Sequence, residues 1–240
     1  MRLVWIDPDA SPDALPEPHR ALRDPNGLLA AGGRLSSDWL LAAYRRGIFP
    51  WSEKDQPILW WSPDPRAVLQ VDRVKISRSL RRKLARKPFE LTADTAFADV
   101  ISACSAPRKH GAGTWITRGI RDAFTRLHSE GWAHSFEAWQ DGALVGGLYG
   151  IAIGHVFFGE SMFARVTDAS KVAFATAASF FTTRRIELVD CQVPTAHLTS
   201  LGATLISRAA FLDELDRLTA EGAKPESWAI DFRSHVSLQK

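Results

Sequence analysis

Residues 133–163 read AHSFEAWQDGALVGGLYGIAIGHVFFGESMF, a segment with three β-rich runs. Ala133–Trp139 alternates in the manner of a half-buried strand, and two further β-rich segments follow at Ala143–Ile153 and Val156–Phe163. Asp141-Gly142 suits a two-residue hairpin turn, because both central positions of that turn need a positive φ. The stretch therefore predicts three consecutive antiparallel strands.

Helical patterns flank these strands, and each has a recognisable cap. Thr117 can cap a helix over residues 118–130, and Thr167 or Asp168 can cap an Ala-rich helix over residues 169–183. The later chain predicts a strand at 186–193, a helix at 195–201, a strand at 203–207 and a helix at 209–220. This order predicts an α/β (α+β) fold with one mixed, mainly antiparallel sheet flanked by helices.

The N-terminal quarter of the chain has a different composition. Residues 1–25 are rich in Pro, Asp and Ala, which favours an extended segment that wraps a surface. A helix is expected over residues 38–46, with Gly47 at its end. At 240 residues the chain is long enough for two domains, and we expect a small one of residues 1–64 and a larger one of residues 65–240.

Tryptophan and proline are concentrated just after this helix. Three of the nine Trp, at positions 51, 60 and 61, lie within eleven residues, and prolines between them restrict the backbone. The rings could form an aromatic core between the two domains. They could equally form a platform that stacks bases, which contributes about 1–3 kcal/mol for each base.

Composition excludes several classes of protein. Hydrophobic residues make up 45% of the chain and charged residues 24%, as in ordinary globular proteins, and no run of about 18 apolar residues is present. The N-terminus lacks the apolar core of a signal peptide, so we expect a cytoplasmic protein. Cys104 and Cys191 lie far apart, and no histidine pair has metal-ligand spacing, so neither a disulfide nor a metal is expected.

Positive charge is concentrated in one short segment. Residues 71–90 hold eight basic and two acidic residues, a local net charge of +6 in a chain whose formal net charge is +3. Leu80 and Leu84 can pack one face of a helix while the basic side chains remain in water. A charged face is often merely solvated, but one sign dominates here, which favours contact with phosphates. The expected contacts are Arg78, Arg81, Arg82, Lys83, Arg86 and Lys87.

Two polar side chains interrupt the apolar strand at 186–193. Alternation places Asp190 and Gln192 together on one face and Cys191 on the other. A carboxylate and an amide about 7 Å apart can share one substrate, with the carboxylate orienting the amide. A nucleophilic Cys191–His197 pair is the competing interpretation, but a thiol in an apolar strand has a raised pKa and is better explained as structural.

Glu160 is the third polar interruption, in the strand at 156–163. Alternation puts it on the same face as Phe158 and Met162, with Ser161 and Phe163 on the other face. Desolvation would raise the pKa of such a carboxyl unless a cation is close. The alternative is a structural ion pair with an internal arginine such as Arg165 or Arg184.

Together these segments resemble the bacterial leucyl/phenylalanyl-tRNA–protein transferase family over roughly residues 25–210. The matching pieces are Gly47–Trp51, Trp60–Arg66, Gly113–Thr117, Leu144–Gly150, Gly159–Phe163, Ala169–Lys171, Asp190–Gln192 and Ser200–Ala203. The resemblance implies transfer of Leu or Phe, with Met as a further candidate, from aminoacyl-tRNA to the N-terminal Arg or Lys of a protein. The product would be a degradation signal under the N-end rule. It also implies a catalytic domain similar to the GNAT acetyltransferase superfamily.

Residue roles follow from the same resemblance. Asp190 and Gln192 match the catalytic pair and Glu160 the acid of the acceptor pocket; we expect Asp190 to hold Gln192 and to attract the acceptor's positive end. Gln192 would position or help deprotonate the attacking amine. The aminoacyl and adenosine group would be bound by Trp51, Trp115, Leu148, Phe157, Ser161, Met162 and Phe163. The basic helix would hold the acceptor stem of the tRNA by its phosphates, so binding is expected to weaken steeply with salt.

Two other functions fit the sequence less well. An acyl-CoA-dependent N-acetyltransferase needs glycines that let its backbone approach the pyrophosphate, but residues 163–171 read FARVTDASK. A non-catalytic RNA-binding module would leave Glu160, Asp190 and Gln192 without a role. We therefore expect no cofactor, aminoacyl-tRNA and acceptor proteins as partners, and a monomer.

Overall fold

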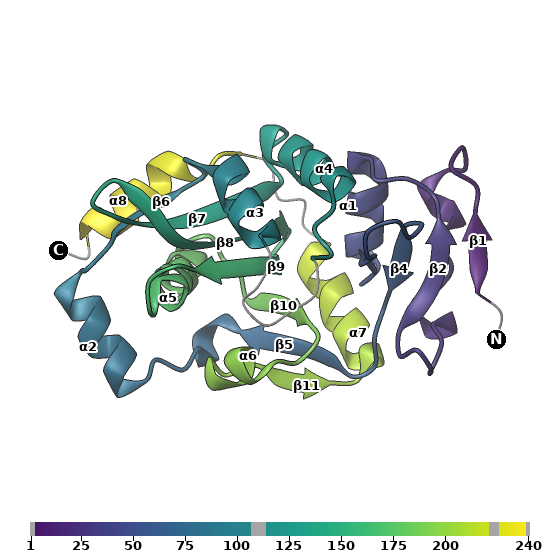
Figure 1. Cartoon of the computed structure of the whole chain (residues 1–240). Helices are drawn as coiled ribbons and strands as arrows, with labels where there is room; N and C mark the ends of the chain where they lie inside the picture. Colours follow the sequence, from purple (N-terminus) through teal and green to yellow (C-terminus); the bar gives the residue numbers. More distant parts are fainter. Residues whose placement is uncertain (1–2, 107–113, 221–225, 239–240) are drawn as a thin grey trace.

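A seven-stranded sheet forms the larger part of the structure, a computed structural model that describes residues 3–106, 114–220 and 226–238 (Figure 1). Gly113, in one of the matching segments, lies outside the described residues. The strand order is β11-β5-β10-β9-β8-β7-β6. The bounds are β5 (Arg66–Gln70), β6 (Glu90–Ala93), β7 (Ala133–Gln140), β8 (Ala143–Ile153), β9 (Val156–Ala164), β10 (Leu188–Gln192) and β11 (Thr204–Ile206). The β9–β10 pair is parallel and the other neighbouring pairs are antiparallel, which confirms the predicted mixed sheet.

The predicted strands of residues 133–163 are confirmed almost to the residue. Asp141 and Gly142 take positive φ values of 51° and 74°, as a tight hairpin turn requires. The sequence patterns gave no prediction for β5, which lies between β10 and β11, or for β6 at the far edge. Both are short and carry Arg66 or Glu90 at their first position, so their alternation is weak.

A second sheet of four strands lies in the N-terminal part of the chain. Its order is β1 (Val4–Ile6), β2 (Leu28–Gly32), β4 (Leu59–Trp61) and β3 (Phe49–Pro50). The segment expected to be extended contributes β1 and two short 3₁₀ helices at Pro12–Ala14 and Pro18–Arg20. A third 3₁₀ helix follows β5 at Val71–Arg73.

Helices cover both faces of the large sheet. One face is covered by α1 (Ser37–Arg45), α3 (Phe97–Ser105), α4 (Arg118–Ser129) and α7 (Arg208–Thr219), and the other by α5 (Ala169–Thr183), α8 (Ala229–Leu238) and, toward one end, α2 (Arg78–Arg86). The short α6 (Ala196–Ser200) follows β10. The sequence patterns predicted all of these except α3 and α8. Thr117 caps α4 as predicted, and Ser77 caps α2, whereas Asp168 holds the N-cap position of α5 without a side-chain cap bond.

The sheet separates two apolar cores. The first core contains residues from the N-terminal sheet, α1, α3, α4 and α7, so it crosses the expected boundary between residues 64 and 65. The second core lies under α5 and α8 and contains a group of aromatic rings that includes Phe136, Phe157, Phe181 and Trp228. Trp60, one of the three clustered tryptophans, is fully buried in the first core and donates from Nε1 to the Gly32 carbonyl.

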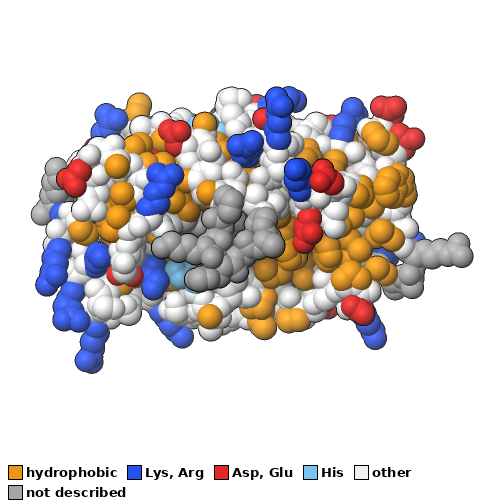
Figure 2. Space-filling model, in the orientation of Figure 1, with side chains coloured by type: hydrophobic (Ala, Val, Ile, Leu, Met, Phe, Trp, Pro, Cys, Tyr) orange, Lys and Arg blue, Asp and Glu red, His pale blue; other side chains and the backbone are white. Residues whose placement is uncertain are grey.

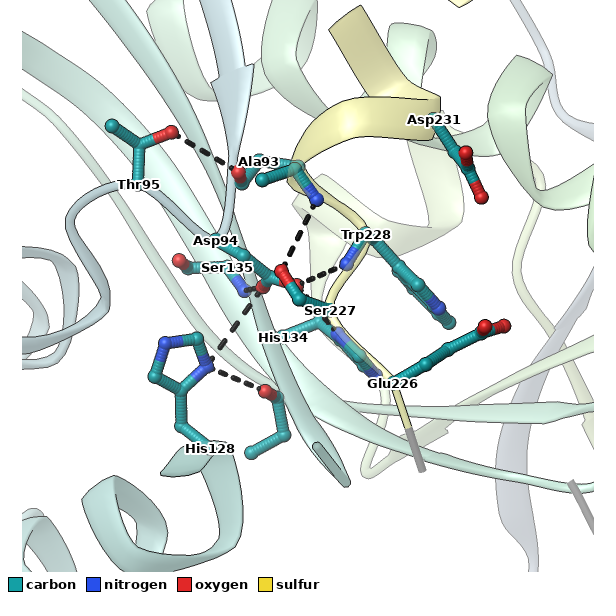
Figure 3. Close-up of polar contacts among 12 residues, drawn as sticks. Ala93, Asp94, Thr95, His128, His134, Ser135, Glu226, Ser227, Trp228 and Asp231 are labelled. Atoms are coloured by element: carbon teal, nitrogen blue, oxygen red, sulfur yellow. Dashed lines mark hydrogen bonds and ion pairs between the residues drawn. The ribbon is translucent and has the colours of Figure 1, made fainter. Parts of the chain in front are cut away.

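A polar network fixes the start of α8 to the sheet (Figure 3). Asp94, directly after β6, accepts hydrogen bonds from the backbone N–H groups of Ser135 and Trp228 at 3.0 and 2.8 Å. The His134 ring lies 2.9 Å from the same carboxylate and stacks on the Trp228 indole at 3.6 Å. These groups are buried and mutually satisfied, so we assign them a structural role. No helix in the described residues is long and apolar enough to cross a membrane.

Gly47 at the end of α1 provides a test of how α1 packs on α7. Its φ is +67°, and a Cβ there would lie 2.7 Å from Leu212 and 3.0 Å from Phe211. Gly142 has a similar φ of +74° but nothing within 4 Å of such a Cβ. G47A should therefore destabilise the fold by about 2–4 kcal/mol and G142A by about 1–2 kcal/mol in urea unfolding. Equal losses would show that α7 does not pack closely on Gly47.

Candidate functional site

The parallel strands β9 and β10 diverge in the middle of the sheet. They pair only over Val156–Phe158 and Leu188–Asp190. β10 pairs with β5 on its other side throughout, and beyond a bulge at Cys191 its Gln192 pairs with Ala67 of β5 but no longer with β9. β9 continues to Ala164 paired with β8, and its residues 159–163 are partly exposed. The divergence leaves an accessible strand edge beside the three polar interruptions of the sequence.

A buried ion pair anchors one side of this divergence. Arg66 donates from Nε to Oδ1 of Asp190 at 2.8 Å and from Nη2 to Oδ2 at 2.7 Å. Both side chains are almost completely inaccessible to solvent, at 1% and 0% exposure. The guanidinium also donates to the Gly47 carbonyl and lies between the Phe49 and Phe211 rings, 4.8 and 4.6 Å from their centroids. Arg66 thus connects β5, β10, α7 and the end of α1.

This pairing corrects the role expected for the Asp190 charge. Both carboxylate oxygens already bind Arg66, and the side chain is not exposed, so Asp190 has no free face with which to attract an acceptor's positive end. Its Oδ1 also accepts the backbone N–H of Gln192 at 3.0 Å. Gln192 has a φ of +55°, a conformation that non-glycine residues rarely adopt. The bond therefore holds Gln192 in a strained conformation that sets where its amide lies.

Gln192 and Glu160 meet across the divergence. The Gln192 Nε2 donates to Oε1 of Glu160 at 3.5 Å, and the Tyr44 hydroxyl donates to the same oxygen at 2.6 Å. Tyr44 is fully buried on α1 and packs edge-on against Phe158. Among the described residues, the second oxygen of Glu160 has no hydrogen-bond partner. That oxygen is available to a ligand.

Glu160 is an acid without a directly paired cation among the described residues. Burial raises its pKa from about 4.5 to about 8; the Tyr44 hydrogen bond and the Arg66 charge oppose this shift, and the nearby Asp190 charge adds to it. None of the ion pairs among residues 3–106, 114–220 and 226–238 includes Glu160. The structural alternative for Glu160 is therefore wrong, because Arg184 pairs with Glu226 and Asp231, and Arg165 donates to the Leu144 carbonyl.

A bulge at Glu160 corrects the expected strand faces. β9 pairs Ser161 with Tyr149 but Gly159 with Gly150, so Glu160 is the extra residue. Met162 therefore packs in the second core, on the face opposite the Glu160–Tyr44 contact. The sequence had predicted a shared face, since alternation cannot reveal a bulge.

The expected aminoacyl-binding residues divide between the two faces. Leu148 and Phe157 are buried in the second core, Met162 packs against that core, and Leu148 is the direct cross-strand neighbour of Met162. Phe163 and Trp115 pack against the first core, and Ser161 is half-buried. Trp51 stands apart in the N-terminal part, 41% exposed and 5.6 Å from the Trp61 ring. Two of the apolar candidates, Leu148 and Met162, are thus direct neighbours.

Cys191 and His197 do not form a nucleophilic pair. Cys191 points into the second core, as alternation predicted, and burial raises its pKa well above that of an ordinary thiol. The His197 Nε2 instead lies 3.0 Å from the sulfur of Met162. The described residues also contain no group of three or more His, Cys, Asp or Glu side chains that could hold a metal ion.

The basic helix α2 forms a positive surface at one end of the molecule. Figure 2 shows Lys and Arg side chains gathered where Figure 1 places α2. Arg78, Arg81, Arg82, Arg86 and Lys87 are exposed. Lys83 donates to the Thr167 carbonyl at 3.0 Å, which places α2 beside the turn that follows β9. The positive surface is therefore connected to the end of the strand that carries Glu160.

Sequence patterns missed two residues of the site. Arg66 carried the same signal as Asp190, a charged side chain beside the apolar run Ala67–Leu69, but it was given no role. Tyr44 carried no such signal, because it occupies the apolar face of α1 beside Leu40 and looks like an ordinary core residue.

Comparison with known proteins agrees with this geometry. Residues 68–216 match the family described as "Leucyl/phenylalanyl-tRNA protein transferase", and residues 33–64 match its N-terminal domain. The chain belongs to the leucyl/phenylalanyl-tRNA–protein transferase family. Glu160, Gln192, Asp190 and Arg66 lie within or directly beside the first matched segment, and Tyr44 lies within the second.

Curated members of the transferase family are similar over almost the whole chain. The protein from Azoarcus sp. (strain BH72) is 59% identical over 216 residues, which cover 90% of this chain and 92% of that protein. The protein from Aromatoleum aromaticum is 58% identical, with 92% and 94% covered, and that from Methylococcus capsulatus is 52% identical, with 94% and 96% covered. All three are named leucyl/phenylalanyl-tRNA–protein transferase.

Solved structures are similar only distantly. L-PGS from Bacillus licheniformis has a TM-score of 0.40 at 12% identity, with 72% of this chain and 55% of that chain covered. A GCN5-related N-acetyltransferase from Anabaena variabilis has a TM-score of 0.39 at 13% identity, with 70% and 41% covered.

Loss of Arg66 should destabilise this transferase-family protein strongly. R66A leaves Asp190 buried without a partner, so the free energy of unfolding should fall by about 3–5 kcal/mol, while R66K, which keeps the charge but not the two-pronged geometry, should lose about 1–3 kcal/mol. R118A is the control, because the Arg118 side chain is 89% exposed and its ion pair with Asp122 is long, at 3.7 Å. Unfolding of R66A and R118A at the same urea concentration would contradict this role.

Proposed function

We propose that this protein transfers Leu or Phe from aminoacyl-tRNA to the N-terminal Arg or Lys of acceptor proteins. The observation that carries the proposal is the unpaired acid Glu160, held by Tyr44 and Gln192 at an accessible strand edge. A buried carboxyl without a cation gains most from a ligand that brings one. An acceptor that begins with Arg or Lys brings two, its α-amine and its side chain.

Glu160 changes protonation when such an acceptor arrives. Its pKa of about 8 keeps most of the carboxyl neutral at pH 7 while the site is empty. A cation beside it favours the carboxylate and lowers that pKa, so binding releases a proton. The acceptor's α-amine has an ordinary pKa near 8, close enough to that of Glu160 for the carboxylate formed on binding to accept the proton that the α-ammonium loses.

Gln192 positions the attacking amine. Because its Nε2 donates to Glu160, its Oε1 is left to accept an N–H of the acceptor's α-amine. The neutral amine attacks the ester carbonyl, the amine loses a proton, the new C–N bond forms, and the ester C–O bond breaks. The neighbouring 2′-hydroxyl gives its proton to the leaving ribose oxygen and receives in return the proton that the amine loses. An amide is a weak base, so orientation is the main contribution of Gln192.

The tRNA contacts extend from the strand edge to α2. We propose that Trp115 stacks on the terminal adenine, with Trp51 nearby. The transferred side chain would contact Leu148, Phe157 and Met162. Ser161 and Phe163 would lie at the border of its pocket. The exposed basic residues of α2 then hold phosphates of the acceptor stem. At the start of α5, the Asp168 carboxylate lies 3.7 and 3.8 Å from the amines of Lys83 and Lys171. A carboxylate at that position disfavours the pyrophosphate of coenzyme A.

A three-way labelling assay tests the function. The protein is incubated with a peptide that begins with Arg and either labelled Leu-tRNA or labelled acetyl-CoA, and peptide labelling only from Leu-tRNA is expected. Labelling only from acetyl-CoA would support an N-acetyltransferase, and no labelling would support a binding module. Q192A should reduce Leu transfer by about 100-fold, because the amine loses its positioning group. Q70A is the matched control, since Gln70 is an exposed glutamine at the end of β5 that lies away from the Ala67–Gln192 pair.

The pH dependence of transfer should report Glu160. Wild-type kcat/KM for the Arg peptide should rise steeply between pH 6 and 9, because the amine and Glu160 both lose a proton near pH 8. E160Q cannot ionise, so its profile should keep only the amine's ionisation and be shallower, with a higher KM. Parallel profiles for wild type and E160Q would contradict the raised pKa.

A further inference from the structure

His197 and Met162 make a contact that the proposed chemistry leaves unexplained. The His197 Nε2 lies 3.0 Å from the Met162 sulfur. His197 lies on α6, directly after β10, and Met162 lies on the part of β9 that β10 does not pair with. The contact therefore joins two chain segments that the divergence of the strands would otherwise leave apart.

Two such bridges cross the divergence, one on each face of the sheet. On the face of α1, Gln192 reaches Glu160. On the face of α5, His197 reaches Met162, which packs in the second core together with Leu148. The first bridge lies where the acceptor is expected, and the second lies beside the apolar residues expected to contact the transferred side chain.

The chemistry of the second bridge suits a device that fixes shape. A methionine side chain has three rotatable bonds and adapts to irregular gaps, so it defines a pocket poorly unless something holds it. An imidazole N–H can donate to the thioether sulfur. Burial and the nearby Lys171 lower the pKa of His197, so the ring is neutral at pH 7 and adds no charge beside an apolar side chain.

We propose that His197 is a specificity-determining residue that holds Met162 and thereby fixes the shape of the site for the transferred side chain. The inference rests on the proposed transferase function. Its consequence is that His197 controls the choice among Leu, Phe and Met without touching the reacting atoms.

The first test is independent of activity. The chain has two methionines, Met1 and Met162, so a protein labelled with ¹³C-methyl methionine gives two methyl signals, and M162L identifies that of Met162 by removing it. H197A should shift this signal and increase the methyl's mobility, and H197Q, whose amide can still donate, should restore part of the order. H19A is the control, because His19 is exposed in the N-terminal part. An unchanged Met162 signal in H197A would overturn the bridge.

The second test compares substrates. In H197A the ratio of kcat/KM for Leu-tRNA to that for Phe-tRNA should change by at least about threefold, the size expected when the shape of an apolar pocket changes slightly. H197Q should restore the ratio in part, and adding H197A to M162L should not change it further. Loss of both activities by the same factor in H197A would overturn a role in specificity.

The two tests separate this inference from the function on which it rests. If wild type and H19A transfer no Leu while H197A still frees the Met162 methyl, the transferase proposal fails and the bridge stands. If wild type transfers Leu while H197A leaves both the methyl signal and the substrate ratio unchanged, the inference about His197 fails alone.

Discussion

The two-pronged ion pair between Arg66 and Asp190 is the interaction on which the site depends. Burial of two charges is favourable only when each is neutralised and its hydrogen bonds are satisfied. Arg66 meets this condition by binding both Asp190 oxygens and the Gly47 carbonyl between two aromatic rings. In doing so it fixes the end of α1, which carries Tyr44, and the end of β10, which carries Gln192.

The pair also separates the two acids of the site. Asp190 is paired with Arg66 and accepts the backbone N–H of Gln192. Its role is therefore to position Gln192. Glu160 has only neutral donors, Tyr44 and Gln192, and burial raises its pKa to about 8. Two neighbouring carboxyls with different partners can thus take different roles, one structural and one available to a cationic substrate.

Sequence alone predicted much of this arrangement, and its failures have physical causes. Hydrophobic periodicity and helix-capping residues predicted the fold class, the strands of residues 133–163 and the helices α1, α2, α4, α5 and α7. Glu160, Asp190 and Gln192 were found because polar groups in apolar strands are costly, and the described structure brings them together. The bulges at Glu160 and Cys191 could not be predicted, since alternation assumes regular pairing. The sheet face predicted for Met162 was wrong because of the bulge at Glu160. Tyr44 could not be identified from the sequence, because its role is a hydrogen bond to Glu160, 116 positions away.

If Arg66 neutralises Asp190, Glu160 is left as a neutral acid that ionises when a cationic acceptor binds. The most direct measurement is a ¹³C NMR titration of the Glu160 side-chain carboxyl, identified by its loss in E160Q, with and without a peptide that begins with Arg. We expect a pKa of about 8 in the free protein and a lower pKa with the peptide bound. A pKa near 4.5 in the free protein, unchanged by the peptide, would contradict it.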